Sequence, residues 1–148
     1  DTVNHQILLN KLNHYGVRGL ANDWFKSYLT ERRQCVSING VTSESTYTKH
    51  GVPQGSVLGP LLFLIYINDL HTCIRHSTVQ HFADDTNLLY SIKNKEQNRN
   101  RNIVRNLNTD LKSLNQWLLA NKIALNETKT ELIFFLKTTP QILNSKKN

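Results

Sequence analysis

The sequence contains no methionine, and among its 148 residues it has only two cysteines. Cys35 and Cys73 lie far apart and share no metal-ligand spacing with each other or with the histidines, so we expect reduced thiols and no structural zinc site. Long apolar runs are also missing. The longest, from Leu61 to Ile67, is far shorter than the roughly 18 residues that suggest a membrane span. These absences exclude a disulfide-rich secreted domain and a transmembrane helix.

The start of the chain lacks two further signals. Position 1 is Asp1 instead of methionine, and no segment with the features of a signal peptide opens the sequence. The sequence therefore reads as a piece of a longer protein, and its two unpaired cysteines favour an intracellular one.

Acidic residues are the minority charge. The chain has 11 Asp and Glu against 18 Lys and Arg, which gives a net charge of +7. The excess favours a polyanionic partner such as nucleic acid, although a solvated basic segment, such as residues 93–105, explains part of it equally well. With 39% hydrophobic and 20% charged residues, the composition indicates one globular domain with a real core.

Two adjacent carboxylates stand between two short segments rich in strand-forming residues. Residues 79–83 and 87–90 are expected to pair, with Asp84, Asp85 and Thr86 at their connection. Carboxylates this close oppose each other's ionisation, and a divalent cation removes that repulsion. Mg²⁺ favours one or two carboxylates together with substrate phosphates, so the pair predicts a phosphoryl- or nucleotidyl-transfer site. An ordinary solvated turn is the alternative.

A cluster of glycine and proline precedes the apolar run. It comprises residues 51–56, Gly-Val-Pro-Gln-Gly-Ser, followed by Gly59 and Pro60. Pro60 suits the first turn of a helix, which we expect from Leu61 to Leu70, apolar on nearly all sides and buried beneath a sheet. The glycines allow the backbone to approach a ligand closely, but the lysine and spacing of a phosphate-binding P-loop are missing.

A strong turn signal, Asn-Gly at 39–40, predicts a hairpin between residues 35–38 and 46–48. Arg32 and Arg33 at its base are either contacts for a nucleic-acid backbone or ordinary surface arginines.

Periodicity places the remaining elements. Apolar residues at helical spacing predict three helices, at residues 4–15, 21–29 and 104–118. Asn4 or Thr2 is a candidate cap for the first, and the aromatic face of the second is expected to pack in the core. Residues 123–125 and 132–136 are expected to pair as strands around a polar turn. The order of helices and antiparallel strands indicates an α+β fold.

Two motifs in combination resemble a known family. Residues 51–70, followed by Phe-Ala-Asp-Asp at 82–85, closely resemble the reverse transcriptase domain of non-LTR, LINE-like retrotransposons. Three further segments resemble its flanking regions: residues 1–12, 27–33 and 125–131. The likeness divides the chain into a partial reverse transcriptase domain, residues 1–136, and a frayed polar tail, residues 137–148.

The resemblance implies a polymerase palm, an antiparallel sheet with helices packed on one face. In the family the acidic hairpin binds metal, here through Asp84 and its partner Asp85, and Mg²⁺, with Mn²⁺ as the alternative, supports transfer of a dNTP to a DNA primer on an RNA template. Phe82 precedes the pair, Ala83 would lie near the primer end, and Lys129 matches a lysine proposed to protonate pyrophosphate, or is a surface lysine in a turn. Four residues match the loop that holds template and nucleotide: Pro53, Gln54, Gly55 and Ser56.

The family pattern also implies parts that this sequence lacks. The first metal-binding aspartate would lie on a strand several residues before Asp1, and the basic fingers further upstream. The resemblance thus implies a palm incomplete at its N-terminal side, inactive alone, from a parent RNA-directed DNA polymerase for which a nuclear location fits. Two alternatives remain: a non-catalytic nucleic-acid-binding relic of a retroelement, and a metal-dependent phosphohydrolase, which the loop at 53–55 disfavours.

Overall fold

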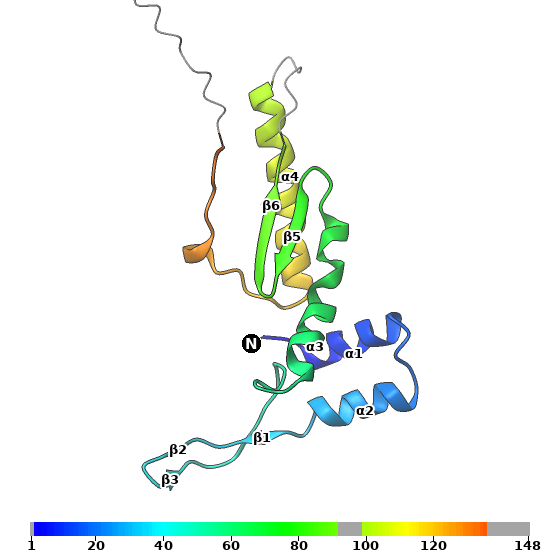
Figure 1. Cartoon of the computed structure of the whole chain (residues 1–148), viewed down its shortest axis with the longest axis vertical. Helices are drawn as coiled ribbons and strands as arrows, with labels where there is room; N and C mark the ends of the chain where they lie inside the picture. The colour runs from blue at the N-terminus through cyan, green and yellow to red at the C-terminus, as the bar shows by residue number, and fades with distance from the viewer. Residues whose placement is uncertain (1, 92–98, 136–148) are drawn as a thin grey trace, which may run out of the picture.

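The computed structural model describes residues 2–91 and 99–135, which Figure 1 shows as an elongated body with a thin projecting arm. Four α-helices lie in these ranges: α1 (His5–His14), α2 (Leu20–Leu29), α3 (Leu58–Ile67) and α4 (Arg99–Ala120). Two short 3₁₀ helices accompany them, η1 (Asn68–Cys73) and η2 (Glu127–Lys129). None of the described helices is both long and apolar enough to cross a membrane.

Six short strands occur in the described ranges: β1 (Arg33–Gln34), β2 (Ser37–Ile38), β3 (Val41–Thr42), β4 (Thr46–Tyr47), β5 (Thr78–Phe82) and β6 (Asp85–Leu89). They form three separate antiparallel pairs, β1–β4, β2–β3 and β5–β6. This mixture of helices and antiparallel strands confirms the α+β class. One continuous sheet covered by helices is not present among the described residues, because each of these strands pairs with a single partner.

The first helix forms as the sequence predicts. The side-chain oxygen of Asn4 accepts a hydrogen bond from the backbone N–H of Ile7 at 3.1 Å, which satisfies one free donor of the first turn. The helix ends at His14, and Gly16 follows with φ of +96°, a conformation that glycine adopts without strain. The predicted helix and cap are confirmed.

The core lies between the first three helices. Its fully buried apolar residues come from the N-terminal segment, α1, α2 and α3: Val3, Leu8, Leu9, Leu12, Leu29, Leu62, Tyr66 and Ile67. The hydroxyl of Tyr66 donates to the backbone oxygen of Asn121 at 2.5 Å and accepts from the backbone N–H of Asn4 at 3.3 Å. Burial raises the pKa of this phenol, which therefore stays protonated and able to donate.

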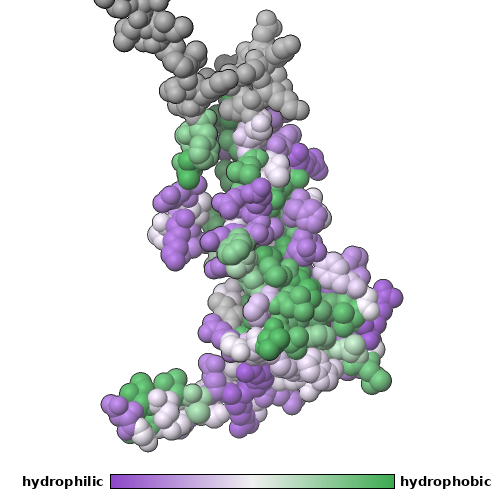
Figure 2. All heavy atoms as spheres, viewed as in Figure 1, coloured by the Kyte–Doolittle hydropathy of each residue, from purple (hydrophilic) through white to green (hydrophobic). Residues whose placement is uncertain are grey.

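Two expectations for helix packing need correction. On α3, Leu61 is 53% exposed and Leu64 46%, because the helix packs on α1 along one side and no sheet covers the other in the described part of the chain. Figure 2 shows hydrophobic side chains gathered on the surface around α3. On α2, Leu29 is buried, but Trp24 is 54% exposed and stacks on Tyr28, so the aromatic face is only partly in the core.

The predicted strand pair near the C-terminal end is wrong over the residues that the structure describes. Residues 123–126 and 130–135 are extended or irregular and have no strand partner, although the polar turn between them is present as η2. Leu132, Ile133, Phe134 and Phe135 are all exposed. Apolar residues of high strand propensity form a strand only where a neighbouring backbone can complete the ladder. The expected tail at 137–148 lies outside the described residues.

Residues 32–48 form the arm seen in Figure 1. The Asn39-Gly40 turn is confirmed, with both residues at positive φ, 50° and 81°. It joins β2 to β3, whereas β4 pairs with β1 closer to the body. The predicted returning strand at 46–48 therefore exists, but its partner is Arg33–Gln34 and not residues 35–38.

Candidate active site

The predicted acidic hairpin is present as β5–β6. Its register pairs Phe82 with Asp85, so a two-residue turn, Ala83-Asp84, connects the strands. Asp85 is therefore the first residue of β6, whereas the sequence predicted that it lies in the turn between the two strands. Both carboxylates are exposed, and Ala83 takes a φ of 52°, which is uncommon for a residue with a Cβ. The turn presents two neighbouring carboxylates to solvent at one end of a rigid hairpin.

A buried aspartate fixes the other end of this hairpin. Asp110 of α4 is 1% exposed. Its two oxygens accept hydrogen bonds from the backbone N–H groups of Arg75, His76 and Ser77 at 2.7–3.2 Å. Burial alone would raise the pKa of Asp110, but these donors outweigh it and hold the pKa below its ordinary value. The carboxylate thus anchors the segment that leads into β5.

One face of the hairpin is covered more than the other. Val79, His81 and Leu88 are half-buried, while their neighbours along each strand are exposed. Figure 1 shows the hairpin lying along α4, and Asn106 of that helix donates to the hydroxyl of Tyr90 at 3.0 Å. This alternation is what a two-stranded sheet with one packed face requires.

His81 belongs to the covered face. Its Nδ1 lies 3.0 Å from the hydroxyl of Thr86, its partner across the strands, and its Nε2 is buried with no hydrogen-bond partner among the described residues. Burial lowers the pKa of His81, and the nearby His71 lowers it further. The imidazole is therefore neutral near pH 7.

The glycine-containing loop before α3 is closed by its own serine. The Ser56 hydroxyl donates to the backbone oxygen of Pro53 at 2.6 Å and accepts from the backbone N–H of Gly59 at 3.0 Å. Gly55 has φ of +75°. A Cβ at Gly59 would lie 2.8 Å from the oxygen of Pro53, so only glycine fits there. The loop leaves Gln54 and Gly55 exposed at its tip.

The structure brings the predicted site residues together only in part. Figure 1 shows the hairpin turn pointing toward the part of the molecule formed by α1 and α3, while the loop lies at the amino end of α3. Lys129 is exposed at the end of η2. The strongest grouping is thus within the hairpin itself: Phe82, Ala83, Asp84 and Asp85.

A family model described as reverse transcriptase (RNA-dependent DNA polymerase) matches residues 1–145. The chain belongs to the reverse transcriptase family. It is 34% identical, over 93% of its length, to the probable RNA-directed DNA polymerase from transposon BS of Drosophila melanogaster. It is 41% identical over 44% of its length to the probable RNA-directed DNA polymerase from transposon X-element of that species, and 39% identical over 46% to the RNA-directed DNA polymerase from mobile element jockey.

These matches confirm the resemblance to non-LTR retrotransposon reverse transcriptases that the motifs predict. The alignments cover 16%, 8% and 8% of the three relatives, so the chain corresponds to a small part of each.

The two hairpin carboxylates of this reverse transcriptase chain have the chemistry of ligands for a divalent cation. Asp84 and Asp85 offer exposed oxygen donors, the type that Mg²⁺ and Mn²⁺ prefer. Within residues 2–91 and 99–135, no group of three or more His, Cys, Asp or Glu side chains is placed to hold a metal ion. The pair therefore fits as two ligands of a cation whose remaining ligands are water or substrate oxygens.

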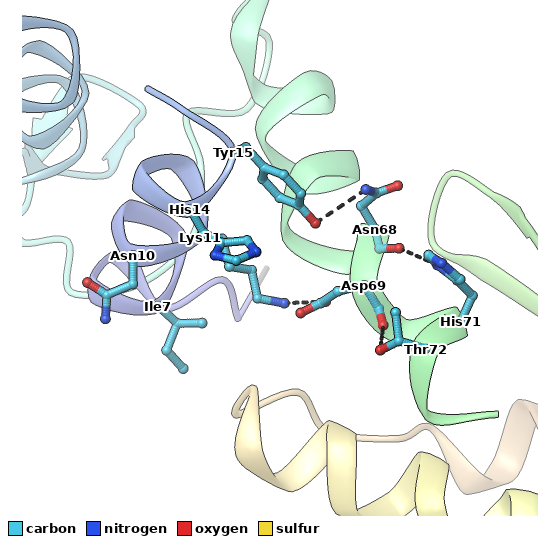
Figure 3. A pocket seen from close by; sticks show the side chains of 9 residues that line it. All are labelled: Ile7, Asn10, Lys11, His14, Tyr15, Asn68, Asp69, His71 and Thr72. Atoms are coloured by element: carbon cyan, nitrogen blue, oxygen red, sulfur yellow. Dashed lines mark hydrogen bonds and ion pairs between the residues drawn. The ribbon is translucent and has the colours of Figure 1, made fainter. Parts of the chain in front are cut away.

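A second polar region lies away from the hairpin. A cavity of about 590 Å³ lies between α1 and η1. Figure 3 shows Lys11 pointing at Asp69 within its lining. The Lys11 ammonium lies 2.5 Å from the carboxylate of Asp69 and 2.6 Å from the backbone oxygen of Tyr66. It also lies 4.8 Å from the ring centre of Trp117. None of the predicted site residues lines this cavity. Lys11 instead links α1, α3, η1 and α4.

Sequence reasoning missed Asp110, Lys11 and Tyr66. A signal existed for Asp110, because it lies three residues after Leu107 and four before Leu114, on the apolar stripe of its helix. An acid on such a stripe needs buried partners. Nothing in the sequence identified the partners as the N–H groups of residues 75–77.

Proposed function

We propose that this chain is the part of an RNA-directed DNA polymerase palm that carries the acidic hairpin, and that the polymerase transfers dNTPs to a DNA primer 3′-hydroxyl on an RNA template. One observation carries the proposal. The turn of β5–β6 presents Asp84 and Asp85 to solvent in a chain of the reverse transcriptase family. A carboxylate pair at a hairpin turn is suited to hold a cation against the phosphates of a nucleotide.

The family resemblance implies a role for each residue of the site. Asp84 and Asp85 would bind Mg²⁺ or Mn²⁺, which lowers the pKa of the primer hydroxyl and neutralises charge on the triphosphate when bound. Phe82 is 80% exposed beside the pair, and by resemblance it would contact the primer end together with Ala83. Lys129, with no hydrogen bond from its ammonium to a described residue, is assigned by resemblance to proton donation to pyrophosphate.

The loop before α3 is assigned to the template strand and the incoming nucleotide. Gly55 has no side chain and Gln54 is exposed, so backbone and amide groups are accessible to a ligand. Pro53 and Ser56 have a supporting role, because the Ser56 hydroxyl is already bonded to the Pro53 oxygen.

Metal binding by the 148-residue chain tests the site directly. Mn²⁺ broadens NMR signals of nearby nuclei, and we expect broadening centred on the amides of Asp84 and Asp85. Asp84→Asn should abolish it, whereas Asp23→Asn, which removes an exposed carboxylate from α2, should leave it unchanged. Broadening that is unsaturable, or that survives Asp84→Asn, would support the alternative of a non-catalytic relic.

Primer extension tests the chemistry. The chain should replace the matching segment of the transposon BS polymerase and retain extension on an RNA template. Asp84→Asn in that chimera should slow extension by about 1000-fold or more, because loss of a metal ligand costs several kcal/mol and each 1.4 kcal/mol is tenfold in rate. The 148-residue chain alone should extend no primer, since its described residues supply two clustered carboxylates and no third ligand. Measurable extension by the chain alone would contradict this last expectation.

A further inference from the structure

The arm, residues 32–48, has no covered face. Every residue from 31 to 47 is exposed, including the apolar side chains of Val36, Ile38 and Val41. The backbone N–H of Thr48 donates to the backbone oxygen of Arg32 at 2.8 Å. This is the last hydrogen bond between the two strands before the arm joins the body. A two-stranded hairpin with neither face packed is marginally stable in water, so an arm of this kind gains order when it lies against a partner.

The charge of the arm indicates which kind of partner it binds. Glu44 is its one acidic residue in the sequence, whereas Arg32 and Arg33 stand together where it joins the body. The polar side chains beside them are an amide and two hydroxyls, from Gln34, Thr46 and Thr48, and the residues that flank the arm, Glu31 and Lys49, cancel in charge. Such groups donate hydrogen bonds to phosphate and sugar oxygens. The half of the arm next to the body is therefore complementary to a polyanion.

Arg33 is held in a fixed orientation for such a contact. It pairs with Tyr47 across the two strands, and its guanidinium carbon lies 4.4 Å from the centre of the tyrosine ring. Its Nη2 also donates to the Tyr47 hydroxyl. Arg33 forms no ion pair with any described residue, so no carboxylate neutralises it there. A guanidinium fixed against a ring loses little freedom when it binds phosphate, and a planar stack of this kind also accepts a nucleotide base.

We propose that the body-proximal half of the arm binds the sugar–phosphate backbone of the RNA–DNA hybrid, with Arg33, stacked on Tyr47, as its main phosphate contact. The inference rests on the proposed function, since it assumes that the chain acts on a hybrid. It adds a contact on an element separate from the acidic hairpin and the loop before α3. A protein partner would instead be expected at the apolar tip formed by Val36, Ile38 and Val41.

Binding of a fluorescent RNA–DNA hybrid to the 148-residue chain tests the proposal. Fluorescence anisotropy is measured over a range of salt concentrations, with EDTA present so that metal binding at the hairpin plays no part. Arg33→Gln should weaken binding roughly tenfold at 0.1 M salt and lower the slope of log K against log salt by about 1. Arg18→Gln, which removes an exposed arginine between α1 and α2, should weaken binding by less than about threefold.

Two further variants separate charge from stacking. Arg33→Lys keeps the charge and should restore the salt slope but only part of the affinity. Tyr47→Leu removes the ring and should weaken binding with an unchanged salt slope. All four variants alter exposed side chains, and circular dichroism should confirm that each retains the helical content of the parent chain.

Three outcomes would overturn the proposal. Equal effects of Arg33→Gln and Arg18→Gln would leave the arm without a specific role. Loss of hybrid binding in an Ile38→Ser, Val41→Ser double variant, with Arg33→Gln unaffected, would move the contact to the tip. Absence of hybrid binding by the parent chain would contradict the proposed arm contact. The Mn²⁺ titration of Asp84 then decides separately whether the proposed polymerase function holds.

Discussion

The β5–β6 hairpin and the arm both turn over two residues, but their surroundings are very different. At each tip a residue with a Cβ takes a positive φ, 52° for Ala83 in β5–β6 and 50° for Asn39 in the arm. The β5–β6 hairpin has one half-buried face and lies along α4. The arm is exposed on both faces. A turn signal therefore determines that a hairpin forms, whereas contacts far away in sequence determine whether it is held in place.

The contacts that hold β5–β6 are few and specific. Asp110 binds the segment before β5 from a position 33 to 35 residues later in the chain, and the Asn106–Tyr90 hydrogen bond joins the end of the hairpin to the same helix. Loop closure over this length costs entropy that a single carboxylate with several donors can offset. The arm has no comparable anchor among the described residues. Fixed carboxylates suit a reaction site, and an uncovered arm suits a contact made on binding.

Among the variants that test this comparison, Asp110→Ala should change the free energy of unfolding most, because it removes the anchor of β5–β6. The backbone N–H groups of Arg75, His76 and Ser77 would lose their acceptor, at a cost of roughly 3 kcal/mol in the free energy of unfolding. Urea denaturation measures the loss, and Glu44→Ala, which removes an exposed carboxylate from the arm, should change stability by less than about 0.5 kcal/mol. Similar losses in the two variants would show that Asp110 does not anchor the hairpin.

The tips themselves provide a smaller test. Ala83→Gly should stabilise the chain by up to about 1 kcal/mol, since alanine is strained at positive φ and glycine is not. Asn39→Gly should change stability by less than about 0.5 kcal/mol, because asparagine tolerates that conformation. Urea midpoints of both variants measure the difference. If Asn39→Gly stabilised as much as Ala83→Gly, strain would not distinguish the two turns.

The smallest expected effect concerns pH. Burial lowers the pKa of His81 in the folded chain below the ordinary value of 6.5, so the unfolded chain binds the proton more readily. The contribution of His81 to the free energy of unfolding is present above pH 6.5. It is lost as the pH falls from 6.5 through the lowered pKa of the folded state. Urea unfolding at about pH 7.5 and 5.5 measures this loss. Between the two pH values the free energy of unfolding should decrease less for His81→Gln than for the parent chain. His14→Gln, at an exposed position, should behave like the parent, and a decrease unaffected by His81→Gln would contradict the prediction.

Local signals predicted much of the fold. The Asn4 cap, the helices at α1, α2 and α4, the Asn39-Gly40 turn and the acidic hairpin all depend on residues close in sequence, and the structure confirms them. The position of the strand ends was less well predicted. Asp85 is in β6 because a two-residue turn pairs it with Phe82, a register that strand propensity alone does not determine.

Long-range structure was not predictable to the same degree. Residues 132–135 have strong strand propensity, but a strand also needs a partner, and none is present in the described ranges. The high hydrophobicity of α3 predicted burial on all sides, whereas only one side meets α1. For the candidate site, the sequence predicted Asp84 and Asp85 from the adjacent carboxylates and from the family resemblance, but it gave no sign of which N–H groups Asp110 would bind.

The hydroxyl of Tyr66 has a consequence for synthesis of the chain. Its acceptor, the oxygen of Asn121, is 55 residues further along. On the ribosome α1, α2 and α3 emerge first and can begin to associate, but the phenol remains without its acceptor until the end of α4 has left the exit tunnel. Completion of the hydrogen bonds of the helical core is thereby coupled to translation of almost the whole described sequence, and a nascent chain stalled before residue 121 would keep the Tyr66 phenol without its acceptor.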